Sequence, residues 1–311
     1  YVQGGAPSDN VAAGAAEVQQ TFVWTIPDNL GNSVLVRVAN KDNENIYGEC
    51  VAPFSIKGVI TVEQPQAAEL VKVTNATENN IKTITWTTFG SITGTADIRL
   101  STDGGTSWPI LLTELSVNVA TPRTYQWTVL SSHQGGNMKV KVALDGDEDL
   151  VTGTAGVSGA FKVIPYLKLD YPNAGGLSFF VGDVMYIKWT PDPGNFGTVD
   201  IRYDTAGGTG GYTGFIADAV ASNNIPGGET QIGYKWTIPD VPGIVGNQVR
   251  VKVYQTGQAS EVFAASQYDI SIKGTVKLTT PSDTLTTPTL VWVCGTQEFI
   301  NWDVTGSLGF V

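Results

Sequence analysis

The sequence predicts an all-β fold made of tandem, seven-stranded β-sandwich domains. Three observations support this: a Trp-containing phrase recurs along the chain, alternating strands follow it, and clusters of Gly, Asn, Asp and Ser separate the strands. The 311 residues include 36 glycines and are 41% hydrophobic and 15% charged, which is typical of a folded, turn-rich protein. This length is enough for two or three domains that each bury a core.

The internal repeat is clearest around one tryptophan of each unit. Trp-Thr-Ile-Pro-Asp occurs at residues 24–28 and again at 236–240, and Trp-Thr-Val occurs at 127–129. After each phrase comes Gly-Asn and then an alternation of apolar and basic residues, as from Val249 to Val253. A period of two indicates a strand with one buried face and one wet face.

A second tryptophan lies earlier in each unit. It ends Ile-Thr-Trp at residues 84–86, Ile-Lys-Trp at 187–189 and Ile-Asn-Trp at 300–302. Two tryptophans per unit would fill the space between two sheets, each burying about 150–250 Å². A sugar-stacking platform is the alternative. We expect a repeated core of Trp24, Trp86, Trp127, Trp189, Trp236 and Trp302.

Residues 59–164 contain seven strand-like runs, around Ile60, Ile84, Ile98, Ile110, Tyr125, Val140 and Phe161. Seven short strands in about 100 residues are typical of Ig-like and fibronectin type III sandwiches. The phrase Ile-x-Trp, Ala-Asp-Ile-Arg, Tyr-x-Trp-Thr and a final Phe-x-Ile resembles the Ser/Thr-rich Ig-like repeat of fungal cell-wall proteins and large prokaryotic surface proteins. The resemblance covers nearly the whole chain. It implies an Ig-like fold at an extracellular cell surface, with no catalytic residues.

The repeat predicts two complete domains, 59–164 and 165–274, between two partial ones. Residues 1–58 hold the second half of an Ig-like domain, and residues 275–311 hold the first half. Either the chain is one period of a longer covalent array, or separate subunits complete each other's half domains head to tail. We favour the first, because a break in mid-strand is a poor assembly joint. The short joints predict a fairly stiff rod.

The two cysteines belong to the two partial domains. Cys50 aligns with Ser266, and Cys294 aligns with Val181. Because the first and last strands of an Ig-like fold run side by side, we expect a Cys50–Cys294 disulfide in the domain that the halves form together. Two buried free thiols are the alternative. The chain has no CxxC motif, so a zinc or redox site is not supported.

Asp145, Asp147 and Asp149 form the strongest acidic cluster, in a turn between two predicted strands. Closely spaced carboxylates on a turn can bind Ca²⁺. The matching residues 255–258 of the next unit contain no acid, so a solvated acidic loop is the alternative. Calcium is the only cofactor that the sequence suggests.

Other motifs are read as structural. The stretch from Ser101 to Trp108 fits a Ser-x-Asp-x-Gly-x-Ser-Trp hairpin, whose Asp-Gly-Gly is expected in a tight turn. His133 is the only histidine, which excludes most multi-histidine metal sites. No nucleophile motif surrounds any serine. The sequence therefore predicts no enzyme.

The net charge of −11 disfavours nucleic acid as a partner, and no apolar run approaches the roughly 18 residues of a membrane span. The predicted function is that of a structural repeat region in an extracellular surface protein or filament. Its partners would be copies of itself or adjacent repeats. The alternative is an adhesin or carbohydrate-binding array, in which loops such as 204–215 or 101–108 contact surface glycans.

Overall fold

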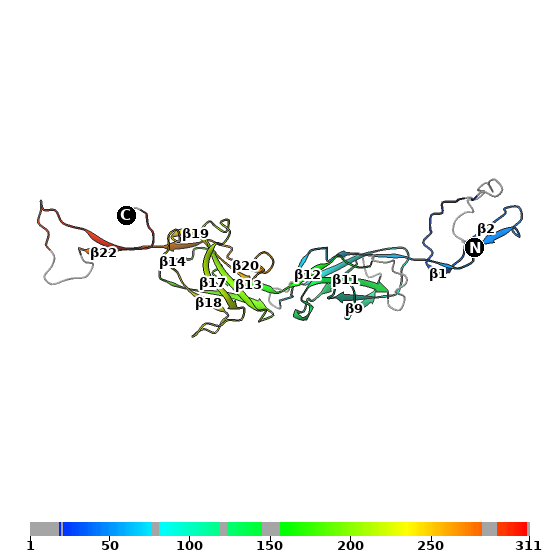
Figure 1. The fold of residues 1–311 in the computed structure, drawn as a ribbon, viewed down its shortest axis with the longest axis horizontal. Helices are drawn as coiled ribbons and strands as arrows, with labels where there is room; N and C mark the ends of the chain where they lie inside the picture. The colour runs from blue at the N-terminus through cyan, green and yellow to red at the C-terminus, as the bar shows by residue number, and fades with distance from the viewer. Residues whose placement is uncertain are drawn as a thin grey trace. The chain divides into compact units, whose positions relative to one another are not determined.

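The computed structural model describes residues 19, 21–75, 81–117, 123–144, 156–281 and 291–309 (Figure 1). These ranges hold 23 strands and one short 3-10 helix, Ser131–His133. The chain divides into two compact units, residues 1–71 with 80–163 and residues 72–79 with 164–311. No helix in the described part of the chain is long and apolar enough to cross a membrane.

The first sandwich consists of strands β5 to β12. One sheet has the order β10 (Arg123–Trp127), β7 (Lys82–Phe89), β5 (Val59–Gln64). The other has the order β6 (Leu70–Lys72), β12 (Phe161–Ile164), β11 (Gly135–Leu144), β8 (Thr95–Ser101), β9 (Ile110–Ser116). The seven predicted runs coincide with seven of these strands. The short strand β6 is an eighth, so the described residues exceed the predicted count of seven.

Buried and more exposed residues alternate along the strands, so the core of the first sandwich lies between its two sheets. Trp86 and Trp127 are 2% and 1% exposed, and Trp127 packs edge-on against Phe161 with ring centroids 6.2 Å apart. Trp86 Nε1 donates a hydrogen bond to the Val117 carbonyl oxygen at 3.4 Å, so its one polar atom is satisfied.

The second sandwich consists of strands β13 to β21. One sheet has the order β13 (Tyr166–Tyr171), β15 (Val184–Asp192), β18 (Gly233–Thr237). The other has the order β14 (Ser178–Phe180), β21 (Ile270–Lys273), β19 (Gly246–Gln255), β16 (Thr198–Asp204), β17 (Gly214–Ala221), with β20 (Phe263–Ala265) also paired to β19. Its core repeats the first: Trp189 Nε1 donates to the Ser222 carbonyl at 2.7 Å, and Trp236 stacks on Tyr203.

The remaining strands belong to two terminal segments. In the amino-terminal segment (residues 21–58), β1 (Gly31–Val34) pairs with β4 (Phe54–Ile56), and β2 (Arg37–Ala39) pairs with β3 (Tyr47–Glu49). In the carboxy-terminal segment (residues 275–281 and 291–309), β22 (Thr275–Thr280) pairs with β23 (Asn301–Thr305).

Candidate functional site

The first candidate site is the joint between the amino-terminal segment and the first sandwich. Asp28 accepts two hydrogen bonds from Ser91, from the backbone N to Oδ1 and from the hydroxyl to Oδ2, both at 2.7 Å. These bonds hold the pKa of Asp28 below its usual value. Gly90 lies beside the carboxylate with φ of +91°, a conformation that favours glycine. A charged carboxylate thus ties one repeat phrase to the start of the next unit.

The aspartate of the same phrase also bonds to the next unit after the second sandwich, at a position one residue earlier in the alignment. Asp240 Oδ2 accepts a hydrogen bond from the backbone N of Gly306 at 3.1 Å. Gly306 aligns with Gly90 and has φ of +87°. A side chain at Gly306 would come within 3.0 Å of the Gly274 Cα, so the close approach requires glycine.

The aligned positions of the middle repeat hold a different set of residues. Ser131, Pro165 and Pro193 stand where the other joints have Asp, Gly and Gly. The three positions therefore change together along the chain. The tryptophan pattern does not identify the joint residues, because they lie outside the repeated tryptophan strands. The aspartate recurring with two glycines is the signal that would have identified them.

A second candidate site is the pair of terminal segments, which expose residues whose counterparts are buried in a sandwich. Ile300 is 55% exposed, whereas the aligned Ile187 is fully buried. Val38 is 74% exposed, whereas the aligned Val253 is fully buried. Positions that a complete sandwich buries are therefore exposed in both terminal segments.

The terminal segments also lack the ladders that join the equivalent strands of the second sandwich. There, residues 184–188 of β15 pair with residues 233–237 of β18. The aligned residues 297–300 and 21–25 are described and carry no strand. Their backbone donors and acceptors are thus left without the ladder that their counterparts form.

The six repeated tryptophans divide in the same way. Trp86, Trp127, Trp189 and Trp236 are buried in the two sandwiches. Trp24 is half-buried and lies edge-on to Phe54, with ring centroids 6.4 Å apart. Trp302 is 44% exposed. Burial of the ring therefore depends on whether both sheets of a sandwich are present.

Cys50 and Cys294 are both free thiols. Cys50 Sγ accepts a hydrogen bond from the backbone N of Val36 at 3.2 Å, and Ser266 Oγ accepts the same bond from Val251 at 3.0 Å. The alignment of Cys50 with Ser266 therefore also holds in the structure.

The second sandwich shows where the two aligned positions lie. Ser266 precedes β21, whereas Val181 donates its backbone N–H to the Lys273 carbonyl at the far end of that strand. The four residues of β21, at about 3.3 Å each, separate the two positions. A disulfide needs a Cα separation of about 4.4–6.8 Å. This geometry argues against a Cys50–Cys294 bridge inside one completed sandwich.

The predicted calcium cluster, Asp145, Asp147 and Asp149, lies outside the described residues. Among the residues that the structure does describe, no group of three or more His, Cys, Asp or Glu side chains is placed to hold a metal ion.

The loop 101–108 is a turn closed by its own aspartate. Asp103 accepts hydrogen bonds from the hydroxyls of Ser107, at 2.6 Å, and Ser101, at 2.7 Å, and from the backbone N of Ser107. The two hydroxyls, Ser107 first, hold the pKa of Asp103 far below its usual range. The carboxylate is occupied within the turn, in agreement with the structural reading.

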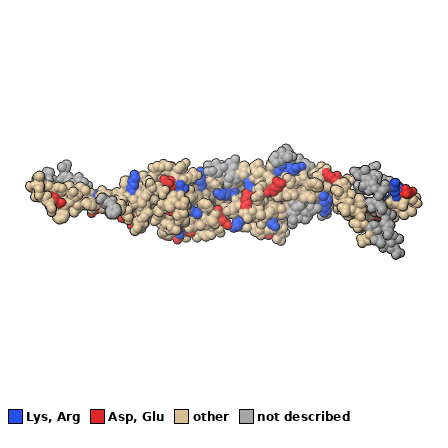
Figure 2. Space-filling model, turned by 90° about the horizontal axis from the view of Figure 1, so that it is seen from above, with Lys and Arg blue, Asp and Glu red and all other residues tan. Residues whose placement is uncertain are grey.

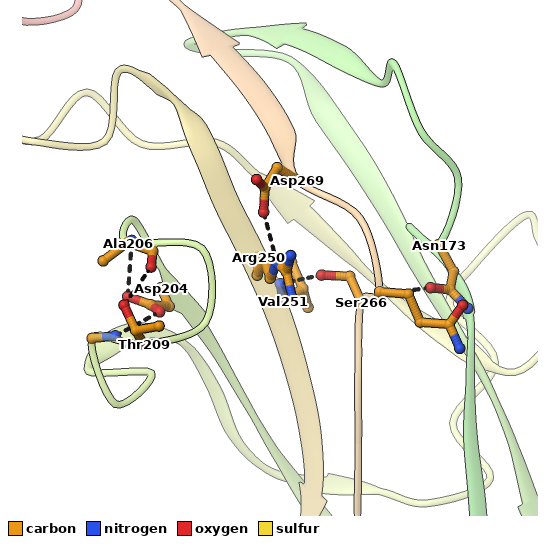
Figure 3. A network of polar contacts seen from close by, with 10 residues as sticks. Asn173, Asp204, Ala206, Thr209, Arg250, Val251, Ser266 and Asp269 are labelled. Carbon is orange, nitrogen blue, oxygen red and sulfur yellow. Dashed lines mark hydrogen bonds and ion pairs between the residues drawn. The ribbon is translucent and has the colours of Figure 1, made fainter.

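The loop 204–215 is likewise closed by hydrogen bonds to its own aspartate (Figure 3). Asp204 is buried, and its carboxylate accepts hydrogen bonds from the backbone N of Ala206 at 3.1 Å and of Gly210 at 2.9 Å. Nearby, Arg250 pairs with Asp269 at 2.6 Å (Figure 3). The acidic group of this loop therefore shapes the loop.

An open depression of 460 Å³ lies on the outer face of the sheet that contains β13 and β15. Its polar groups bond to one another. Thr190 Oγ1 donates to Asp170 Oδ2 at 2.6 Å, and Lys188 Nζ donates to Gln231 Oε1 at 3.1 Å. The lining groups named here are thus satisfied without a ligand.

The outer face of the larger sheet carries aromatic rings around one lysine. Lys252 Nζ lies 4.3 Å from the ring centroid of Phe263 and 5.6 Å from those of Tyr212 and Tyr254. Burial lowers the pKa of Lys252. The rings serve as partners for this cation.

On the face shown in Figure 2, basic and acidic side chains are scattered among neutral residues.

Comparison with known proteins gives matches among solved structures alone. No protein-family model matches the chain, and no curated protein matches it. Solved structures that match include fibronectin(III)-like modules of Clostridium thermocellum CbhA, with 19% identity over 68% of this chain and 94% of that one, at a TM-score of 0.22.

Two other solved structures resemble the chain to a similar extent. The I-band fragment I67–I69 of titin has 9% identity over 74% of this chain and 71% of that one, with a TM-score of 0.25. Extracellular domains 3–5 of Drosophila OTK have 14% identity over 71% and 67%, with a TM-score of 0.22. At these scores the assignment rests on the chain's own sheets, which make it an all-β protein of tandem, Ig-like β-sandwiches.

Proposed function

We propose that this chain is a structural repeat region of an extracellular surface protein or filament, in which β-sandwiches continue end to end into neighbouring repeats or subunits. The pair of equivalent joints carries the proposal. Asp28 with Ser91, and Asp240 with Gly306, make the same kind of contact at two places along the chain. In a repeat array each unit contacts only its neighbours, so a recurring joint is the element that determines the array.

The connections between repeats support this proposal. Only two residues separate Ile56 at the end of β4 from Val59 at the start of β5, and single residues separate β12 from β13 and β21 from β22. A connection of this length has few soft dihedral angles, so it limits bending between successive repeats.

The chemistry of the described residues supports a non-catalytic role. His133, the only histidine, is buried, and its Nδ1 accepts hydrogen bonds from Trp127 Nε1 at 3.3 Å and from the Leu130 backbone N at 3.1 Å. A histidine whose Nδ1 accepts two bonds inside a core serves the fold. The proposal therefore assigns no reaction to this region.

Electron micrographs of single molecules test the proposal. We expect straight particles of uniform length for the natural chain and a wider spread of bend angles for the double variant Asp28→Ala, Asp240→Ala. Asp103→Ala is the matched control, because this aspartate has the same kind of bonds inside one hairpin. The spread should not change in the control.

A glycan array tests the alternative, an adhesin or carbohydrate-binding function. The proposal expects no bound glycan. Specific glycan binding, together with bend angles that the double variant leaves unchanged, would overturn the structural function in favour of the alternative.

A further inference from the structure

We propose that the carboxy-terminal segment of one copy of this chain docks onto the amino-terminal segment of a second copy, and that together they complete one sandwich. This inference rests on the proposed structural function and names its partner. The second sandwich shows how such a domain is assembled.

Each terminal segment reproduces the strand register of one part of a complete sandwich. The β22–β23 ladder has a register shift between Leu278 and Thr280, and the β13–β15 ladder has the same shift between Leu169 and Tyr171. The β5–β7 ladder has it between Val62 and Gln64. The carboxy-terminal segment is therefore built as the first two strands of a three-stranded sheet.

The amino-terminal segment matches the strands that close the other sheet. Gly31 pairs with Ile56 and Val34 with Phe54, with a register shift between the pairs. In the second sandwich β19 and β21 pair in the same way, at Gly246 with Ile272 and Val249 with Ile270. The pairing of β2 with β3 likewise repeats that of β19 with β20. The two segments thus supply different parts of one fold.

Two of the ladders missing from the two segments would join them. In the second sandwich, Met185 pairs with Trp236 and Ile187 with Tyr234. The aligned pairs are Glu298 with Trp24 and Ile300 with Phe22, one member from each segment. Pairing residues 297–301 with 21–25 would satisfy the open backbone of both by strand addition.

A second missing ladder is the parallel pair of β14 with β21. In the carboxy-terminal segment the turn that follows β14 is already formed. Thr296 N donates to the Val293 carbonyl at 3.1 Å, as Asp183 N donates to Phe180 at 3.0 Å. The aligned residues 291–293 carry no strand, and their template partners align with residues 55–57 of the other segment. This contact would place Cys294 beside Lys57.

Six exposed apolar residues of the two segments occupy core positions of the template. Their aligned residues in the second sandwich are at most 4% exposed. In the carboxy-terminal segment they are Val276, Leu278, Ile300 and Trp302, and in the amino-terminal segment Val38 and Ile46. Both surfaces are apolar on the side that the template buries, so docking removes both from water.

Each chain carries one surface of each kind, so a second copy can supply the partner of either segment. The contact is head to tail, and head-to-tail contacts that do not close into a ring generate filaments. Growth by this route uses no surface of the two complete sandwiches.

Thiol cross-linking tests the contact. The double variant Cys50→Ser, Lys57→Cys leaves one thiol in each segment, at positions that the template makes neighbours. A short bismaleimide, which alkylates both thiols, is expected to produce a ladder of covalent multimers on a denaturing gel. The matched control is Cys50→Ser, Lys273→Cys, which places the thiol at the equivalent position of a complete sandwich and should give no ladder. A cross-link within single chains, or equal ladders from both variants, would overturn the proposal.

Sedimentation velocity tests whether the apolar face is the one buried. The natural chain is expected to form multimers as its concentration rises, and Ile300→Asp is expected to remain a 33.0 kDa monomer. Ile225→Asp is the control, because Ile225 is 54% exposed and lies between β17 and β18 of the complete second sandwich, outside both terminal segments. It should associate like the natural chain. A monomeric natural chain, or equal association of all three, contradicts the inference.

A head-to-tail fusion of two copies separates this inference from the proposed function. If the natural chain is monomeric but the fusion gains an additional cooperative unfolding transition, the array is covalent and only the second-copy partner is wrong. If the fusion gains no transition, the end-to-end function fails as well.

Discussion

The indole Nε1 of Trp127 donates a hydrogen bond to Nδ1 of His133 at 3.3 Å, inside the core of the first sandwich. The Leu130 backbone N donates to the same nitrogen, so the bonded form of the ring is neutral. Burial, which disfavours the charged form of the ring, also lowers the pKa of His133.

Acidification is expected to destabilise the first sandwich before the second. Because the folded pKa of His133 lies below the unfolded value of about 6.5, its contribution is complete above pH 6.5 and is lost as the pH falls toward the folded pKa. Calorimetry between pH 7.5 and pH 5 should show the first transition falling toward lower temperature. The second sandwich contains no histidine and serves as the internal reference. The same pH dependence in His133→Asn would refute the assignment.

Ser266→Ala is expected to destabilise the second sandwich by about 1–3 kcal/mol, since it leaves the buried backbone N–H of Val251 without its acceptor. Ser266→Cys introduces the residue found at position 50 and should cost less, because Cys50 Sγ accepts the same bond. Urea denaturation measures both. Equal losses for Ala and Cys would show that the hydrogen bond is not the cause.

Trp189→Ala is expected to cost about 3–5 kcal/mol in unfolding free energy, because the ring is buried and the change leaves a cavity. Trp302→Ala removes the aligned ring and should change the stability of the dilute monomer by no more than about 0.5 kcal/mol, because this ring is 44% exposed. Urea denaturation at low protein concentration checks both. A large loss for Trp302→Ala would mean that its ring is already packed in the single chain.

Gly306→Ala is expected to loosen the ribbon β22–β23. Its φ of +87° is strained for alanine, and the new Cβ would meet the Cα of Gly274. Hydrogen exchange of β22–β23 should become faster in the variant. Gly194→Ala is the control, because no atom lies within 4 Å of a Cβ built there and its φ is not in the left-handed region. Unchanged exchange in Gly306→Ala would show that the close approach does not hold the joint.

The strands and cores of the two sandwiches could be predicted from the sequence. Alternation at period two and the paired tryptophans are local patterns, and they identified every strand of the first sandwich except β6. Strands β6 and β14 have three residues each, too few for a periodic pattern. They form because a last strand, β12 or β21, offers them a free edge.

The joints and the cysteines depended on the tertiary structure. Asp28 bonds to Ser91, which lies 63 residues away, and such a pairing exists only after both repeats have folded. The alignment placed Cys50 on Ser266 correctly, because equivalent residues in a repeat share their backbone partners. It did not show that Val181 lies beside one end of β21 and Ser266 before the other end. The position of a residue along a neighbouring strand is set by the register of the ladder. The sequence by itself determined which residues form strands and cores, and the tertiary structure decided which of those strands have partners.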